Sequence, residues 1–206
     1  MNWVERIHSN HIVGRRARVL SRYLAQVIPE AATLLDVGCG DGLIDSLIRD
    51  LRPDLELQGI DVLVRSKAFI PVTPFDGRTL PYANSSFDCV MFVDVLHHAL
   101  DPIALLGEAV RACRQSIVIK DHALEGFLAN STLRMMDEIG NRRYGVALPF
   151  NYWTTEQWLA AWNRLGLEVK TQMTKLGLYP WPLSLIFDRS LHFVARLDRI
   201  PFSQRL

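Results

Sequence analysis

Short apolar runs alternate along the chain with segments in which apolar residues recur every three or four positions. The runs are typical of strands buried on both faces, and the periodic segments are typical of helices with one buried side. The expected strands are Thr33–Val37, Leu55–Asp61, one near Phe69–Thr73, Ser86–Val93 and Ser116–Lys120. The expected helices are Arg15–Val27, Leu43–Leu51, one that Asp101 and Pro102 begin, and Leu124–Ile139. Strands that alternate with helices predict an α/β fold around a parallel sheet.

The C-terminal part departs from this alternation. Thr154 and Gln157 form a capping box, and Trp153 and Trp158 occupy the positions of a hydrophobic staple, so a helix begins at this point. We expect the two apolar segments that follow to pair as an antiparallel hairpin, and these are Leu167–Leu178 and Leu191–Leu197. The hairpin brings the expected sheet to seven strands.

The segment Leu34–Gly42 carries the clearest local signal in the chain. A buried strand runs directly into glycines at three alternate positions, Gly38, Gly40 and Gly42, and a helix follows at once. Glycine lets the backbone approach a ligand closely because it has no Cβ, and a helix N-terminus favours negative charge. The order of strand, glycine turn and helix is the first half of a nucleotide-binding βαβ unit.

The spacing of this turn differs from that of a dinucleotide site, which requires G-x-G-x-x-G. Here it is G-x-G-x-G, with an acidic residue, Asp36, two positions before the first glycine. Asp61 ends the next apolar segment about twenty residues on, where a carboxylate can accept hydrogen bonds from ribose hydroxyls. Only nine residues separate Asp61 from Pro71, so the crossover there is short or irregular. Pro71 and Pro74 make the third strand an edge strand at best.

These residues resemble a known family. Leu34–Gly42 resembles the first motif of the class I S-adenosylmethionine-dependent methyltransferases, and Gly59–Asp61 resembles their second. Four further motifs resemble the small-molecule branch with the compact methyltransferase type 11-like domain: Asp76-Gly77, Leu80-Pro81-Tyr82, Ser86-Phe87-Asp88 and Val95-Leu96-His97-His98. The resemblance implies a Rossmann-like, doubly wound, seven-stranded mixed sheet with the last strand antiparallel. It also implies one methyltransferase domain over residues 1–206.

The resemblance implies S-adenosyl-L-methionine as cofactor and S-adenosyl-L-homocysteine as product. The cofactor-binding residues that it implies are Asp36, Gly38, Cys39, Gly40, Asp61, Val62, Asp76, Gly77 and Asp94. Asp36 and the glycine amides would hold the methionine end, Asp61 the ribose and Asp76 the adenine. Asp76-Gly77 could also be a simple turn.

The end of the fourth expected strand carries His97 and His98, the two candidate catalytic residues. An imidazole can act as a general base near neutral pH, and we expect neighbouring histidines to point different ways, so that at most one faces the transferred methyl. Packing or capping of the loop is the alternative interpretation. No third ligand recurs at a metal-like spacing, so no metal is expected. Asp121 and His122 end the fifth strand, within reach of a substrate.

Three segments are candidates for covering the site. Residues 1–28 form an N-terminal helical segment and candidate lid, with His8, His11 and Arg15. Residues 123–152 form a helical insertion and loop near the acceptor pocket, in which Arg142 and Arg143 could hold an anionic group. The apolar segment 177–187 could cover the core, form a homodimer or meet a lipid-like substrate.

Composition restricts the partners. The net charge is +1 from 23 basic and 22 acidic residues, and no basic stripe with interleaved aromatics occurs, so nucleic acid is an unexpected partner. No apolar run approaches eighteen residues, and three cysteines without pair spacing are typical of reduced thiols, so a cytoplasmic protein without a transmembrane segment is expected. We therefore expect a methyltransferase for a small, partly apolar acceptor. A protein or RNA methyltransferase and a non-catalytic S-adenosylmethionine-binding protein are the alternatives.

Overall fold

The computed structural model of the protein describes residues 14–141 and 148–200. The strands are β1 (Thr33–Val37), β2 (Glu56–Asp61), β3 (Val72–Pro74), β4 (Phe87–Val93), β5 (Cys113–His122), β6 (Leu167–Met173) and β7 (His192–Arg199). The helices are α2 (Gly14–Val27), α3 (Leu43–Leu51), the 3₁₀ turn η2 (Leu96–His98), α4 (Pro102–Ala112), α5 (Ala129–Asn141), α6 (Thr155–Arg164) and α7 (Ser184–Phe187). The predictions about His8, His11, Arg142 and Arg143 fall outside the described residues.

The described strands form a seven-stranded sheet in the order β3-β2-β1-β4-β5-β7-β6. Strands β1 to β5 pair in parallel, and β7 lies antiparallel between β5 and β6. From β1 the sheet is extended to one side by β2 and β3, and β4 then adds to the other side of β1. The strand order therefore has its switch point between β1 and β4, where open α/β sheets bind ligands. The expected mixed, doubly wound sheet with an antiparallel last strand is confirmed.

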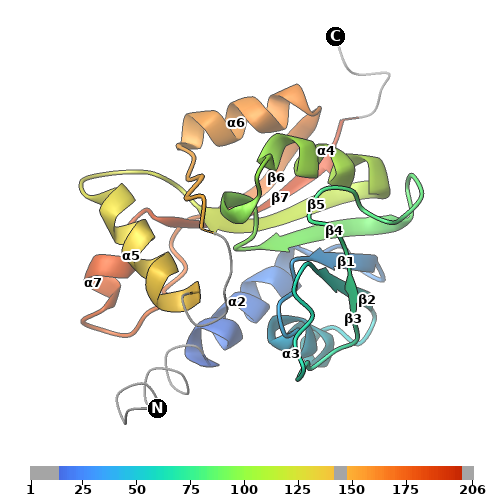
Figure 1. Ribbon diagram of the computed structural model, residues 1–206, viewed down its shortest axis with the longest axis horizontal. Coiled ribbons are helices and arrows are strands. Elements are labelled where there is room, and N and C mark those ends of the chain that lie inside the picture. Colours follow the sequence, from blue (N-terminus) through green and yellow to red (C-terminus); the bar gives the residue numbers. More distant parts are fainter. Residues whose placement is uncertain (1–13, 142–147, 201–206) are drawn as a thin grey trace.

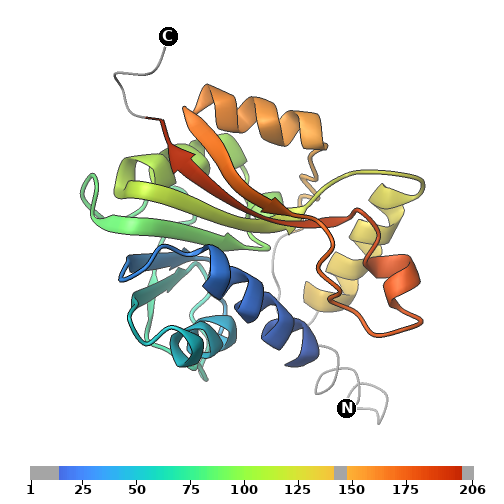
Figure 2. The ribbon, with the colours of Figure 1, turned by 180° about the vertical axis from the view of Figure 1, so that it is seen from behind.

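Helices cover both faces of the sheet, with α4 and α6 on one side and α2 and α3 on the other (Figures 1 and 2). Alternate residues of the central strands divide between the two sides, because successive side chains of a strand point to opposite faces. Leu35, Val90 and Phe92 pack with α4 and α6, whereas Leu34 and Met91 pack with α2 and α3. The central strands are therefore buried on both faces, as their continuous apolar runs predict.

Several element boundaries follow the local sequence signals closely. Strand β1 and helix α3 have the expected bounds, and Asp101 caps α4 by accepting from the Ala104 backbone N–H. The capping box of Thr154 and Gln157 is present at the start of α6. The staple rings of Trp153 and Trp158 lie 4.7 Å apart.

Several expected bounds differ from the structure: β5 extends from Cys113 to His122, and β6 ends at Met173 and not at Leu178. Strand β3 lies at Val72–Pro74, a little later than expected, and the stretch that leads to it contains no helix. Helix α5 begins at Ala129 and not at Leu124, because Gly126 and Leu128 both have positive φ angles that a helix cannot include. Its exposed side carries Met135 and Ile139.

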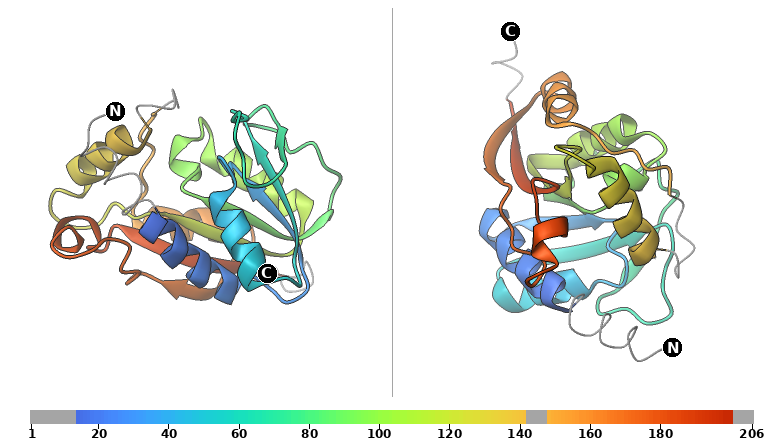
Figure 3. Two further views of the ribbon diagram at one scale, coloured as in Figure 1. Left: turned by 90° about the horizontal axis from the view of Figure 1, so that it is seen from below. Right: turned by 90° about the vertical axis from the view of Figure 1, so that its left-hand side faces the viewer.

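Helices α5 and α7 stand apart from the layered part, beyond the carboxyl ends of the parallel strands (Figure 3). A small separate core, which includes Ala129, Leu133 and Leu191, is buried against α5. The apolar segment 177–187 leaves Trp181 81% and Leu185 67% exposed, so it does not serve only to cover the core. A homodimer through this segment stays a prediction. Within the described ranges, no helix is long and apolar enough to cross a bilayer.

Candidate functional site

The parallel strands deliver their polar residues to one edge of the sheet. Asp36 pairs with Gly59 of β2 and with Met91 of β4, one residue before β1 ends. Asp61 ends β2, and Asp94 directly follows β4. Because parallel strands end at a common edge, these carboxylates gather where an open α/β sheet binds its ligands.

The glycine turn after β1 needs its glycines for two reasons. Gly38, Gly40 and Gly42 have φ angles of +79°, +64° and +72°, which L side chains rarely adopt. A Cβ on Gly38 would lie 2.5 Å from a methyl group of Val95, and one on Gly42 would lie 2.3 Å from the Ile70 side chain. The turn therefore presses against the loop after β4 on one side and the segment before β3 on the other.

The amides of this turn are already used within the protein. Gly38 and Cys39 donate to the Ile60 carbonyl, at 2.8 and 3.1 Å, and Gly40 donates to Asp61 Oδ2 at 2.8 Å. The sequence-based expectation that the glycine amides hold a ligand is not supported by this geometry. At its three glycines, however, the turn lets a ligand approach the backbone closely, because no side chain is in the way.

Beneath the turn, Asp36 meets Asp45 of the first turn of α3, and both side chains are buried. Burial raises the pKa of Asp36 well above its usual range, and the negative charge of Asp45 adds to the rise. Burial also raises the pKa of Asp45, to about 6. Among the described residues, Asp36 Oδ1 and both Asp45 oxygens have no hydrogen-bond donor. The pair therefore shares a proton near neutral pH or requires a cationic donor from outside the described residues.

Asp61 links the turn to the neighbouring crossover. Its second oxygen, Oδ1, accepts from the Leu63 N–H at 2.8 Å, and its side chain stays half-buried. The next residue, Val62, packs against Gly77, where a Cβ would lie 3.0 Å from the valine methyl. The structure therefore brings together Asp61, Val62 and Gly77, all predicted to bind cofactor.

Asp76 has a structural role that the sequence left open as an alternative. Its Oδ1 accepts from the backbone N–H groups of Arg78 and Thr79, both at 2.7 Å, and these bonds lower its pKa. Asp76 is therefore the first residue of a turn. Its exposed side chain leaves adenine contact a prediction.

Asp94 is part of an ion cluster at the end of β4. It pairs with Arg16 of α2 and with Lys120, which is fully buried in β5. Burial alone would raise the pKa of Asp94, but the two cations outweigh burial and hold it well below the usual range. Burial and the adjacent Lys120 lower the pKa of His122 and His192, so both are neutral.

His97 lies in a second buried cluster, next to the first. Its Nδ1 is 2.6 Å from Asp121 Oδ1, and its Nε2 is 3.4 Å from Asp137 Oδ1 of α5. Burial disfavours the imidazolium, yet the two carboxylates raise the pKa of His97 to about 10. The His98 ring lies 4.0 Å from the His97 ring, centre to centre, so the expectation that the two histidines diverge is wrong. Burial and the charge of His97 lower the pKa of His98.

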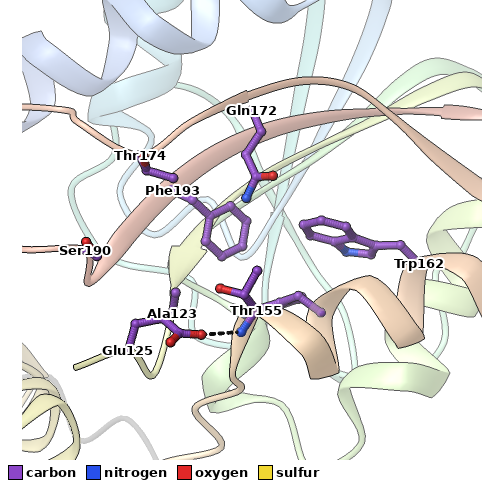
Figure 4. A pocket seen from close by; sticks show the side chains of 9 residues that line it. Ala123, Glu125, Thr155, Trp162, Gln172, Thr174, Ser190 and Phe193 are labelled. Carbon is purple, nitrogen blue, oxygen red and sulfur yellow. Dashed lines mark hydrogen bonds between the residues drawn. The ribbon is translucent and has the colours of Figure 1, made fainter. Parts of the chain in front are cut away.

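A hollow of about 120 Å³ lies elsewhere, between α6 and strands β6 and β7 (Figure 4). Trp162, Phe193 and Gln172 line it, and Glu125 accepts from the Thr155 N–H at 2.8 Å beside it. Its volume is well below the 300 Å³ or more of typical ligand sites. None of the residues that line it belongs to the strand ends described above.

Four residues of the site escaped the sequence analysis: Arg16, Asp45, Lys120 and Asp137. Each lies in a segment read only as a helix or a strand, and its role depends on contacts with distant elements. Of these four, only Lys120 could have been recognised from its position in the sequence. A lysine in a strand buried on both faces is almost never fully buried unless it has a partner of opposite charge.

Comparison with known proteins agrees with this geometry. A family model described as a methyltransferase domain matches residues 9–172. The ubiquinone biosynthesis O-methyltransferase of Cereibacter sphaeroides is 31% identical over 121 residues. That match covers 52% of this chain and 45% of the relative, so the chain matches less than half of the relative's length.

Solved structures share the fold at low sequence identity. A methyltransferase in complex with the Haloferax volcanii Trm112 methyltransferase activator has a TM-score of 0.70 and 17% identity, covering 97% of this chain and 96% of its own. The geranyl diphosphate C-methyltransferase of Streptomyces coelicolor has a TM-score of 0.67 and 13% identity, with coverage of 88% and 78%. A SAM-dependent methyltransferase from Thermotoga maritima has a TM-score of 0.63 and 20% identity, with coverage of 96% and 95%. Family match, strand order and glycine turn lead to one conclusion: the chain belongs to the class I S-adenosylmethionine-dependent methyltransferases.

Proposed function

We propose that this chain methylates a small, partly apolar acceptor at the carboxyl edge of its sheet. S-adenosylmethionine supplies a methyl group on a positively charged sulfur. The observation that carries the proposal is the buried carboxyl pair of Asp36 and Asp45 under the glycine turn, in which Asp36 Oδ1 and both Asp45 oxygens lack a donor within the described residues.

The chemistry of the edge fits the amino-acid end of the cofactor. An ammonium group would supply the donors and the positive charge that Asp36 and Asp45 lack. Arg16 Nε is a buried donor with no hydrogen-bond partner among the described residues, so it fits a carboxylate. Gly38 lies against Val95, the residue that follows Asp94, and Asp94 is the ion-pair partner of Arg16.

The nucleoside end fits the crossover after β2. Each carboxylate oxygen of Asp61 has accepted one backbone hydrogen bond and keeps a lone pair for a ribose hydroxyl. Val62, Leu63 and Val64 follow directly, and their side chains are 46–61% exposed. An adenine ring would cover apolar surface of this kind.

On the acceptor side, the residues at the end of β4 hold charge in fixed positions. With no metal ion bound, His97 is an imidazolium at neutral pH and cannot accept a proton there, and His98 is the one of the pair that stays neutral. Methyl transfer gains much of its rate from alignment of the acceptor with the methyl group. A general base is therefore not required, and a catalytic role for His97 or His98 stays a prediction.

Two further observations favour a small acceptor over a macromolecule. The net charge of +1 provides no field that attracts nucleic acid. The relative from Cereibacter sphaeroides is named for an O-methylation in ubiquinone biosynthesis, which is small-molecule chemistry.

We expect the purified protein to transfer labelled methyl from S-adenosylmethionine to apolar phenols and aromatic acids. The rate should change little between low and moderate salt, because recognition of such acceptors does not depend on neutralised phosphates. Labelled methyl that appears only in added RNA or protein would contradict the small-acceptor proposal. Binding of S-adenosylmethionine without transfer to any acceptor would favour the non-catalytic alternative.

We expect Asp61→Ala to weaken S-adenosylmethionine binding about tenfold or more, measured by calorimetric titration, since a hydrogen bond to a charged acceptor contributes about 1.5–3 kcal/mol. Asp61→Asn keeps one acceptor oxygen and should lose less. Asp54→Ala is the matched control, because Asp54 bonds to Arg52 and to the Ala31 N–H in the turn before β2, at the opposite edge of the sheet. Unchanged affinity in folded Asp61→Ala would remove the ribose assignment.

We expect Asp45→Asn to raise the free energy of unfolding at pH 7–8. The wild-type carboxyl has a pKa raised from 3.8 to about 6, so the folded state holds its proton more tightly than the unfolded state does. Stability from this group is therefore present below pH 4 and is lost as the pH rises through 6, a loss of about 3 kcal/mol in all.

Denaturant unfolding of both proteins between pH 4 and 8 measures this effect. The advantage of Asp45→Asn should grow across that range and level off above the raised pKa. Asp50→Asn, an exposed carboxyl on the same helix, is the control and should show no such trend. A pH-independent difference for Asp45→Asn would show that the buried pair does not share a proton.

A further inference from the structure

The cluster around His97 combines side chains from two separate elements. His97 and His98 form η2 after β4, and Asp137 projects from α5. One donor atom from each of the three lies within 4.8 Å of the other two. Two histidines and one carboxylate are a common ligand set for zinc and related divalent transition metals.

The two ring nitrogens of His97 have different surroundings. Nδ1 is 2.6 Å from Asp121 Oδ1, which fixes the orientation of the ring. Nε2 is buried, has no hydrogen-bond partner among the described residues, and faces Asp137 Oδ1. Metal-binding histidines in proteins are oriented in this way, with one nitrogen bonded to a carboxylate and the other bound to the metal.

The spacing of the donor atoms also suits a metal ion. Two atoms that each lie about 2.1 Å from a tetrahedral zinc ion are about 3.4 Å apart. His97 Nε2 and Asp137 Oδ1 are separated by 3.4 Å. This distance is longer than the 2.7–3.2 Å of ordinary N–H···O hydrogen bonds, whereas the contact of Nδ1 with Asp121 is not.

Asp137 is itself held in place by a second partner. The Tyr152 hydroxyl donates to Oδ2 of Asp137, which leaves Oδ1 to face the histidine. The Tyr152 ring stacks on His97 with 5.6 Å between centres. Ligand carboxylates in metal sites are commonly held by hydrogen bonds of this kind.

Asp121 and His122 form an alternative group with His97, but Asp121 is already engaged. It accepts from His97 Nδ1 and from the backbone N–H groups of Leu96 and His122. Because the oxygens of Asp121 are already used in these hydrogen bonds, Asp121 orients His97 and does not bind the metal. The ligand set is therefore His97, His98 and Asp137.

We propose that His97 Nε2, a ring nitrogen of His98 and Asp137 Oδ1 bind a divalent transition-metal ion of the zinc type. Three protein ligands leave at least one coordination position open, as in zinc sites that bind a substrate or water. His98 is half-exposed, so the open position is accessible from the carboxyl edge. The inference departs from the expectation of no metal, because Asp137 is too distant in sequence to show a metal-like spacing.

This proposal, which rests on the proposed function for its role, assigns the open position to a hydroxyl oxygen of the acceptor. A metal ion lowers the pKa of a bound hydroxyl. The O–H bond breaks and its proton leaves to solvent, and the oxygen's electron pair forms the new bond to the methyl carbon. The pair of the broken carbon–sulfur bond stays on sulfur, so the sulfonium becomes a neutral thioether.

Titration of the tag-free, metal-stripped protein with Co²⁺ tests the site without any turnover. We expect visible absorption bands of a four- or five-coordinate ion that saturate at one Co²⁺ per chain and disappear when Zn²⁺ displaces it. Zn²⁺ should also raise the thermal unfolding midpoint. Asp137→Asn and His98→Ala should weaken binding at least tenfold. Tyr152→Phe removes only the hydrogen bond that holds Asp137, and it should weaken metal binding by about 10–100-fold or less.

Cys39→Ser is the control for metal captured by a free thiol, since Cys39 is half-exposed, and it should keep the cobalt spectrum. Binding of S-adenosylmethionine, measured on the same samples, separates the two proposals. A folded protein that binds S-adenosylmethionine but gives no cobalt bands overturns the metal site alone, and His97 is then an imidazolium held between two carboxylates. Cobalt binding that survives both Asp137→Asn and His98→Ala overturns it as well.

Discussion

The site depends on the close approach of three backbone segments at the glycine turn. Gly38 leaves room for Val95, and Gly42 leaves room for Ile70. A side chain at either position would push away the loop after β4 or the segment before β3, and each of these carries residues of the candidate site. Gly59 in β2 has the same role toward Cys39, whose sulfur would lie 2.7 Å from a Cβ there. The three glycines therefore allow the segments that carry the candidate site residues to pack against one another at the carboxyl edge of the sheet.

The buried charged groups at this edge differ in how many partners of opposite charge they have. Within the part of the chain that the structure describes, the carboxyl pair under the turn forms no ion pair, Asp94 forms ion pairs with two cations, and His97 lies between two carboxylates. Buried charge is costly unless it is paired, so each imbalance marks a place where a ligand can contribute the missing partner. The unpaired carboxyls fit an ammonium group, and the His97 cluster, with its excess of negative charge, fits a metal cation. Both positions lie where an open α/β sheet binds its ligands.

The sequence predicted what depends on local signals. Strand β1, helix α3 and the start of α6 follow from an apolar run, a glycine and a capping box, and the structure has them as expected. Helix α5 was placed too early because positive φ at Leu128, a non-glycine residue, cannot be read from its side chain. The partners of His97 were missed for a different reason: Asp137 reaches it only through the packing of α5, which no spacing along the chain records.

The central claim is that the glycine turn and its carboxylates bind S-adenosylmethionine, and calorimetric titration of the purified protein tests it most directly. The account predicts ~micromolar binding of S-adenosylmethionine and of S-adenosylhomocysteine. It predicts no binding of a nicotinamide dinucleotide, because the turn lacks the third glycine at the dinucleotide spacing. Failure of both sulfur nucleosides to bind a folded protein would contradict the account.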